Sequence, residues 1–123
     1  MGKNVKRILC VEDDKDFCEL LTIALPDFEF VNAATISDAV EKAREGGFSM
    51  IFMEYFLPDG RGEEACRRIR AFDKTTPVLF ITESRSFNQN LAVGLGAQGA
   101  LKKSSPTFIE DLTTRTLELA SAV

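Results

Sequence analysis

Short apolar runs alternate along the chain with segments in which apolar residues recur every three to four positions. The apolar runs predict strands at 7–11, 28–33, 50–54, 77–81 and 99–101. The helical spacing predicts helices between 14 and 26, between 35 and 46, over 63–72, over 86–95 and from 105 onward. Strands that alternate with helices in a short chain predict an α/β fold with a parallel, doubly wound sheet and right-handed crossovers.

The third predicted strand organises this picture. It is apolar from Met50 to Met53, continues into Glu54, and is followed by the turn sequence Pro58-Asp59-Gly60. A strand that is apolar on both faces belongs in the middle of a parallel sheet covered by helices on both sides. We therefore expect Glu54 at the carboxyl end of a central strand, where open α/β sheets place their ligand sites.

Capping residues mark the expected helix boundaries. Asp14 or a neighbour can cap the first helix, and Thr35 begins a capping-box sequence for the second. Ser105 followed by Pro106 has the form of an N-cap with proline at the first helical position. The fourth helix has the weakest pattern, and we expect it to bury a thin stripe made of Phe87, Leu91 and Leu95.

Composition limits the possible functions. The 123 residues are 45% hydrophobic and 28% charged, which suits a single domain over 1–123, and the net charge of -4 argues against a nucleic-acid or membrane surface. No apolar run reaches transmembrane length, and the basic start leads into too few apolar residues for a signal peptide. Cys10, Cys18 and Cys66 form no CxxC pair, which predicts reduced thiols in a cytoplasmic protein. Because histidine is absent, catalysis would rest on carboxylates, lysines, hydroxyls or a metal.

Polar or charged residues close four of the predicted strands. They are the acidic loop 12–14, Glu54, Thr82 and Lys103, and in this fold they lie at one rim of the sheet. Carboxylates about 4 Å apart repel by roughly 1 kcal/mol in water and about 4 kcal/mol in a partly screened site, so an acidic cluster here needs a cation. Lys103 and a hard divalent ion are the available counter-charges, and oxygen ligands favour Mg²⁺. We expect Lys103 to point inward and Lys102 to be a surface residue.

Four motifs carry a resemblance to the receiver domain of bacterial response regulators. They are Val11-Glu12-Asp13-Asp14, the acidic strand end before Leu57-Pro58-Asp59-Gly60-Arg61-Gly62, the strand that ends at Thr82, and the segment from Gly96 to Lys103. The resemblance implies a flavodoxin-like (βα)5 fold with strand order 2-1-3-4-5. It also implies Mg²⁺-dependent transfer of a phosphoryl group from a histidine kinase or phosphotransfer protein to an aspartate. By position, Glu12, Asp13, Glu54 and the backbone carbonyl of Phe56 would hold Mg²⁺, Thr82 would be the switch hydroxyl, and Lys103 would pair with the phosphoryl group.

The chain departs from this family pattern at the acceptor itself. Glu54 stands where the family has its phosphoacceptor aspartate, and its carboxylate lies one carbon-carbon bond, about 1.5 Å, further out. Misplacement on the order of 1 Å can cost about a hundredfold in rate, so we expect impaired phosphorylation and weakened Mg²⁺ binding. Glu54 could instead approach Lys103 and Thr82 and hold a partly activated-like state. A single charge makes such mimicry of a phosphoryl group incomplete.

Two further positions differ from the family. Ala100 stands in place of the aromatic residue that rotates inward on activation, and Ser104 replaces a proline that is often joined by a cis peptide bond. Tyr55, Phe80 and Phe87 are candidate substitutes for the missing aromatic residue, although Phe80 is more simply a core strand residue. Without that proline, the peptide bond after Lys103 has no cis preference, and this affects the direction of the Lys103 side chain.

Three hypotheses for the function belong to different classes. The favoured one is a receiver-like signalling module of a two-component or phosphorelay system, impaired in phosphorylation and acting by protein–protein interaction. The second is a working receiver that uses Glu54 or Asp59 as acceptor, and the third is an unrelated Mg²⁺-dependent, phosphatase-like enzyme. The expected partner is a histidine kinase or phosphotransfer protein, or a downstream protein on the face of the fourth helix, fifth strand and fifth helix. A homodimer is a further possibility.

Overall fold

A computed structural model describes residues 5–121, and the ends of the predicted domain, 1–4 and 122–123, lie outside the described residues. Five parallel strands form the sheet in the order β2-β1-β3-β6-β7. They are β1 (Arg7–Val11), β2 (Glu29–Ala33), β3 (Met50–Glu54), β6 (Val78–Thr82) and β7 (Gly99–Lys102). Counted along the sheet strands alone, this is the expected order 2-1-3-4-5, so the flavodoxin-like prediction is confirmed.

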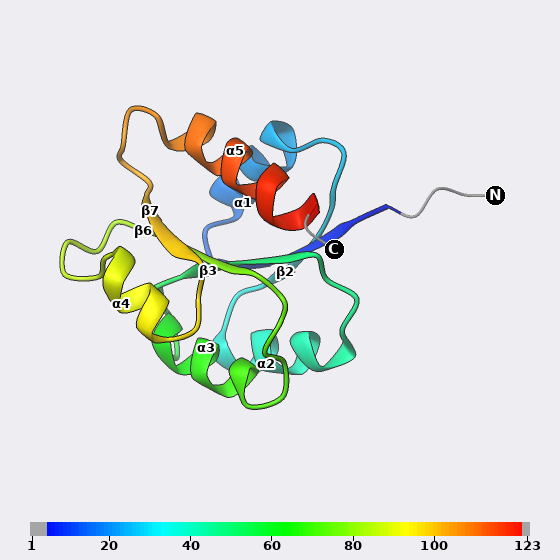
Figure 1. Cartoon of the computed structure of the whole chain (residues 1–123), viewed down its shortest axis with the longest axis vertical. Helices are drawn as coiled ribbons and strands as arrows, with labels where there is room; N and C mark the ends of the chain where they lie inside the picture. The colour runs from blue at the N-terminus through cyan, green and yellow to red at the C-terminus, as the bar shows by residue number, and fades with distance from the viewer. Residues whose placement is uncertain (1–4, 122–123) are drawn as a thin grey trace.

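Five helices cover the two faces of the sheet (Figure 1). They are α1 (Lys15–Ala24), α2 (Ile36–Glu45), α3 (Gly62–Arg70), α4 (Gln89–Gly94) and α5 (Phe108–Ser121). Figure 1 shows α1 and α5 on one face and α2, α3 and α4 on the other. Among the helices of residues 5–121, none has the length and apolar character needed to cross a membrane.

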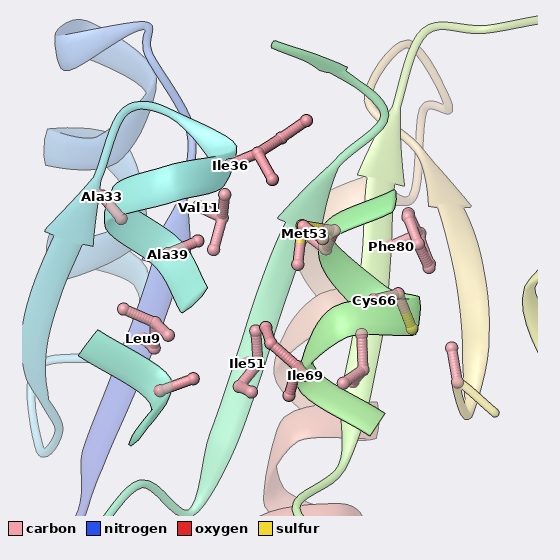
Figure 2. Packing of buried hydrophobic residues seen from close by; sticks show 14 of the residues in the cluster. Leu9, Val11, Ala33, Ile36, Ala39, Ile51, Met53, Cys66, Ile69 and Phe80 are labelled. Carbon is pink, nitrogen blue, oxygen red and sulfur yellow. The ribbon is translucent and has the colours of Figure 1, made fainter. Parts of the chain in front are cut away.

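Side chains alternate between the two faces of the strands and make two cores. On the side of α2 and α3, the sheet contributes Leu9, Val11, Ile51, Met53 and Phe80 (Figure 2). On the side of α1 and α5, it contributes Ile8, Cys10, Met50, Phe52, Leu79 and Ile81. All five residues of β3 are buried, which confirms that it is a central strand covered on both faces. Burying each large apolar side chain stabilises the fold by about 1.5 to 3 kcal/mol.

Local side chains fix most of the helix starts. Asp14 caps α1 by accepting hydrogen bonds from the amides of Asp16 and Phe17, and Thr35 caps α2 by accepting one from the amide of Asp38. Gly46, at φ 74°, ends α2, as its position after the helical pattern predicts.

Two predicted helix starts were wrong. The fourth helix begins at Gln89 instead of 86, because Asn88 accepts a hydrogen bond from the amide of Leu91 and caps the helix there. The expected stripe is wrong in part: Phe87 is 1% exposed but precedes the helix, Leu95 packs against the core, and Leu91 is 47% exposed. The last helix begins at Phe108, since Ser105 instead forms a turn in which its carbonyl accepts from the amide of Phe108.

A short antiparallel hairpin follows β3. Its strands are β4 (Phe56–Leu57) and β5 (Gly60–Arg61), joined by the Pro58-Asp59 turn, and it leads directly into α3. The amide of Gly62 donates to the carbonyl of Tyr55 at 2.7 Å, which brings the start of α3 against the end of β3. A Cβ atom at Gly62 would lie 2.3 Å from the backbone oxygen of Glu54, so this close approach requires glycine.

Candidate functional site

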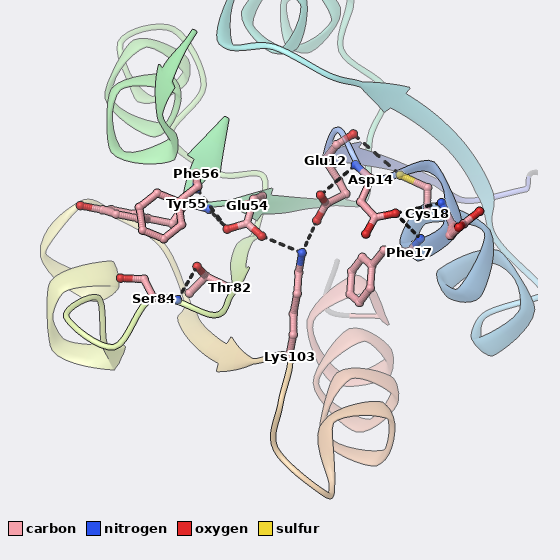
Figure 3. Close-up of polar contacts among 11 residues, drawn as sticks. Glu12, Asp14, Phe17, Cys18, Glu54, Tyr55, Phe56, Thr82, Ser84 and Lys103 are labelled. Carbon is pink, nitrogen blue, oxygen red and sulfur yellow. Dashed lines mark hydrogen bonds and ion pairs between the residues drawn. The ribbon is translucent and has the colours of Figure 1, made fainter. Parts of the chain in front are cut away.

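The carboxyl ends of four parallel strands bring the predicted site residues to one rim. Glu12 follows β1, Glu54 ends β3, Thr82 ends β6, and Lys103 follows β7 (Figure 3). The backbone holds this rim as well, since the amide of Glu12 donates to the carbonyl of Ala33 at 2.9 Å and that of Lys103 donates to the carbonyl of Thr82 at 3.1 Å. The arrangement confirms that these residues converge on one edge of the sheet.

The centre of the site is an ion-pair triad of Lys103, Glu12 and Glu54. The ammonium nitrogen of Lys103 lies 2.5 Å from Oε1 of Glu12 and 2.6 Å from Oε1 of Glu54 (Figure 3). The side chains of Lys103, Glu12 and Glu54 are 13%, 2% and 8% exposed, so water screens these charges weakly. Lys103 therefore points inward, as expected, and it supplies the counter-charge for two carboxylates at once.

Backbone amides hold the second oxygen of each carboxylate. Oε2 of Glu12 accepts from the amide of Asp14 at 3.1 Å. Oε2 of Glu54 accepts from the amides of Tyr55 at 2.6 Å and Phe56 at 3.1 Å. All four carboxylate oxygens of the triad thus have a donor, which satisfies these buried acceptors and fixes the two side chains.

Burial and the ion pairs act in opposite directions on the triad. Burial raises the pKa of the Glu12 carboxyl above its ordinary value, against the opposing effects of the Lys103 ammonium and the Asp14 amide. Burial alone would lower the pKa of Lys103, but its hydrogen bonds to Glu12 and Glu54 raise that pKa overall. The Lys103 ammonium also lies 4.2 Å from the centre of the Phe17 ring, which adds a cation–π contact. Lys103 is therefore held in its charged form.

The predicted metal ligands do not all converge. Asp13 is exposed, and within residues 5–121 no group of three or more acidic or sulfur side chains is arranged to hold a metal ion. Phe56 is the first residue of β4, and its amide donates a hydrogen bond to Glu54. The residues in this arrangement do not fit a resident Mg²⁺ ion, because Lys103 and backbone amides already occupy the oxygens of Glu12 and Glu54. The metal assignment for Glu12, Asp13, Glu54 and Phe56 stays a prediction.

The other two candidate residues make contacts of their own. Thr82 is fully buried, and its hydroxyl oxygen accepts from the amide of Ser84 at 3.0 Å. Asp59 is exposed, and its carboxylate accepts from the amides of Ile36 at 2.8 Å and Ser37 at 3.3 Å. The amide of Ile36 holds the pKa of Asp59 below its ordinary value. Asp59 therefore caps α2 from a distant turn, which is a structural role.

Lys102 corrects one prediction. It is half-buried and not a free surface lysine, and its ammonium donates to the carbonyls of Ser84 and, at 3.0 Å, Phe87. The sequence signal that could have found it is the register of β7, which places Lys102 beside Thr82 at the start of the β6–α4 loop. Ala100 is half-buried and Ser104 is exposed, and all peptide bonds in residues 5–121 are trans, including that between Lys103 and Ser104.

A groove of about 890 Å³ opens beside the triad between α1 and α5. Lys103 lines it together with the apolar residues Phe17, Leu20, Pro106, Phe108 and Ile109. Leu20 is 43% exposed and Ile109 is 39% exposed, so part of this apolar lining faces solvent. The groove therefore brings Lys103, alone of the triad, to a partly apolar surface between α1 and α5.

Residues 8–115 match the family described as the response regulator receiver domain. Among curated proteins, the chain is 30% identical over 115 residues to the response regulator ArlR of Staphylococcus haemolyticus, covering 88% of this chain and 49% of that protein. The chain spans about half the length of the curated relatives it matches, or less. These matches give no support to an unrelated phosphatase-like enzyme.

Solved structures show the same fold. The non-phosphorylated HemR receiver domain from Leptospira biflexa is 30% identical, with a TM-score of 0.83 over 96% of each chain. The receiver domain of the Saccharomyces cerevisiae response regulator Ssk1, crystallised with the histidine phosphotransfer protein Ypd1, is 25% identical with a TM-score of 0.82. That match covers 94% of this chain and 89% of the other.

Proposed function

Because this chain belongs to the response regulator receiver domain family, we propose that it is an atypical receiver with Glu54 at the phosphoacceptor position. It acts as a signalling module of a two-component or phosphorelay system, is impaired in phosphorylation, and works by protein–protein interaction. It is not an enzyme beyond, at most, receiver-type self-phosphorylation. One observation carries the proposal: the ammonium of Lys103 binds Glu12 and Glu54 together.

A carboxylate attacks phosphorus through a free lone pair directed at the incoming group. In Glu54 one oxygen is held by Lys103 at 2.6 Å and the other by two backbone amides. Oε1 keeps a second lone-pair site beside Lys103, but turning it toward phosphorus breaks contacts that each contribute about 1.5 to 3 kcal/mol, which raises the barrier to attack. The longer side chain of glutamate adds to this cost because it displaces the oxygen by about 1.5 Å from the place of an aspartate oxygen.

The same contact supports a partial resemblance to the activated state. Glu54 makes the contact with Lys103 that the family pattern gives to a phosphoryl group. Within residues 5–121 it forms no hydrogen bond with Thr82, whose hydroxyl oxygen instead accepts from the amide of Ser84. A glutamate also brings one negative charge where a phosphoryl group brings nearly two. We therefore propose that Glu54 reproduces the lysine contact of a phosphorylated receiver and leaves the threonine contact unmade.

Receiver domains generally bind Mg²⁺ for phosphorylation. Bound Mg²⁺ would neutralise charge on an incoming phosphoryl group, but Glu12 and Glu54 do not fit the ion in their present arrangement. In this chain the Lys103 ammonium already neutralises both. We propose weak Mg²⁺ binding that requires Lys103 to leave the carboxylates.

The partner follows from the family and from the groove. We propose a histidine kinase or phosphotransfer protein as the partner, since the similar Ssk1 receiver was crystallised with Ypd1. We place this partner over the α1–α5 groove because Lys103 and apolar side chains line it together. A downstream protein or a second copy would use the face of α4, β7 and α5, where Leu91 and Val93 are 47% and 54% exposed.

The test is the intact mass of the protein after incubation with acetyl phosphate and Mg²⁺. We expect no added phosphoryl group on the native protein and one on the Glu54→Asp variant, since aspartate shortens the side chain and frees it from Lys103. Asp59→Asn in both backgrounds controls for reaction at the turn. A phosphoryl group on the native protein that Glu54→Gln abolishes would establish a working receiver that uses Glu54 and would contradict the proposal.

A further inference from the structure

Lys102 joins the edge strand to the loop that precedes α4. It lies on β7 in register with Thr82 of β6, and its ammonium donates to the main-chain carbonyls of Ser84 and Phe87. Both carbonyls belong to a segment without regular secondary structure, so neither is satisfied by a helix or by the sheet. Charge-assisted hydrogen bonds of this kind are about twice as strong as neutral ones.

The loop is closed on itself around the same residues. The amide of Ser84 donates to the hydroxyl oxygen of Thr82 at 3.0 Å, and the amide of Phe87 donates to the hydroxyl oxygen of Ser84 at 3.2 Å. The first of these bonds joins the loop to the end of β6, and the second lies within the loop. Lys102, from the neighbouring strand, spans the turn that the second bond closes, because it binds the carbonyls of Ser84 and Phe87 at its two ends.

The closed loop places an aromatic side chain against the site. Phe87 is 1% exposed, and its ring centre lies 4.6 Å from that of Phe80 and 4.7 Å from that of Tyr55. The Tyr55 ring is stacked on it at an interplanar angle of 28°, and the amide of Tyr55 donates to Glu54 at 2.6 Å. A continuous series of contacts thus runs from Glu54 through Tyr55 and Phe87 to Lys102.

We propose that Lys102 is a clamp that holds the β6–α4 loop closed and keeps Phe87 stacked on Tyr55. Release of its ammonium would free the carbonyls of Ser84 and Phe87 and allow Phe87 to leave the aromatic cluster. The start of α4 at Gln89 would move with it, because Phe87 precedes that helix by two residues. The clamp is a positioning device: it acts through the loop and through Tyr55, and touches neither carboxylate of the triad.

The test compares Lys102→Met with Lys74→Met. Methionine keeps an unbranched apolar side chain and removes the charge, and Lys74 is a matched control because its ammonium donates to one carbonyl, that of Arg70, on the surface. We expect hydrogen exchange at the amides of Ser84 and Phe87 to become about ten- to a hundredfold faster in Lys102→Met only. Acrylamide should also quench Tyr55 more strongly, and this residue is a clean probe because the chain has one tyrosine and no tryptophan.

Native-like exchange and quenching in Lys102→Met, or equal changes in Lys74→Met, would overturn the proposal. A measurement on the unaltered protein does not depend on how the variant folds. An ammonium held by two carbonyls exchanges its protons slowly with water. NMR that detects the ammonium nitrogen should therefore show the signal of the Lys102 ammonium and not that of the Lys74 ammonium. Absence of the Lys102 signal under conditions where that of buried Lys103 is seen would equally overturn it.

Discussion

Replacing Lys103 with methionine removes the positive charge that lies between two buried carboxylates. Lys103 is 13% exposed, and its ammonium lies 2.5 Å and 2.6 Å from Glu12 and Glu54, which are 2% and 8% exposed. Removing one partner of a buried ion pair costs about 3 to 5 kcal/mol, because the charge left behind is neither solvated nor paired. We expect Lys103→Met to lower the free energy of unfolding by this amount at neutral pH, measured by urea unfolding followed by circular dichroism.

The control is Lys42→Met, since Lys42 pairs with Asp38 at 2.9 Å on the surface of α2 with side chains 30% and 38% exposed. An exposed pair one helical turn apart contributes about 0.5 kcal/mol, so the control should lose far less stability. Mg²⁺ should stabilise Lys103→Met and leave the native protein unchanged, because the metal can then replace the missing ammonium. Two results would refute the assignment of Lys103 as the counter-charge of the site. One is a decrease in the free energy of unfolding of Lys103→Met below about 1 kcal/mol, which is too small for a buried ion pair. The other is equal stabilisation of both proteins by Mg²⁺.

Three other predictions concern the elements that position the site. Asp59→Ala should lower the free energy of unfolding by about 1 kcal/mol, because it uncaps α2. Since the folded pKa of Asp59 is lowered, its contribution is present above the ordinary aspartate pKa of about 3.9 and is lost as the pH falls through the folded value. The difference in free energy of unfolding between the native protein and the variant, measured with urea, should therefore become smaller in acid. Gly62→Ala should destabilise by about 1 to 3 kcal/mol or more because its Cβ would lie 2.3 Å from the backbone oxygen of Glu54, whereas Gly94→Ala, with nothing within 4 Å, should be neutral or stabilising in thermal unfolding. Asn88→Ala should speed hydrogen exchange at Leu91 by about fivefold through loss of a cap that contributes about 1 kcal/mol, and unchanged exchange would contradict the assigned start of α4.

The rim of the site could be predicted because it depends on strand order and on where apolar runs end. The run from Met50 into Glu54 placed the acid at the end of a central strand, and the inward direction of Lys103 followed from the need for a counter-charge. These inferences use the periodicity of apolar residues and the balance of charge at the strand ends, and neither requires the detailed contact geometry.

The contacts made across the fold were beyond the sequence pattern. Asp59 caps a helix 23 residues earlier in the chain, and Lys102 binds a loop 15 and 18 residues earlier. The start of α4 depends on the side chain of Asn88, which accepts from the amide of Leu91, and apolar spacing does not record such a cap. Asp13 carries the same charge as Glu12, yet one is exposed and the other is buried, because only Glu12 faces Lys103.

The central claim is that the Lys103 ammonium already neutralises the Glu54 carboxylate, so that the carboxylate has no need of a metal ion. The most direct measurement is an NMR titration of the native protein with Mg²⁺ and beryllofluoride, an analogue of a phosphoryl group, followed at the amides of Tyr55 and Phe56, which donate to Glu54. We predict no saturable shift of these two amides at millimolar concentrations in the native protein, and a saturable shift in Glu54→Asp. A saturable shift in the native protein would contradict the account and establish a pocket that accepts the phosphoryl group despite Glu54.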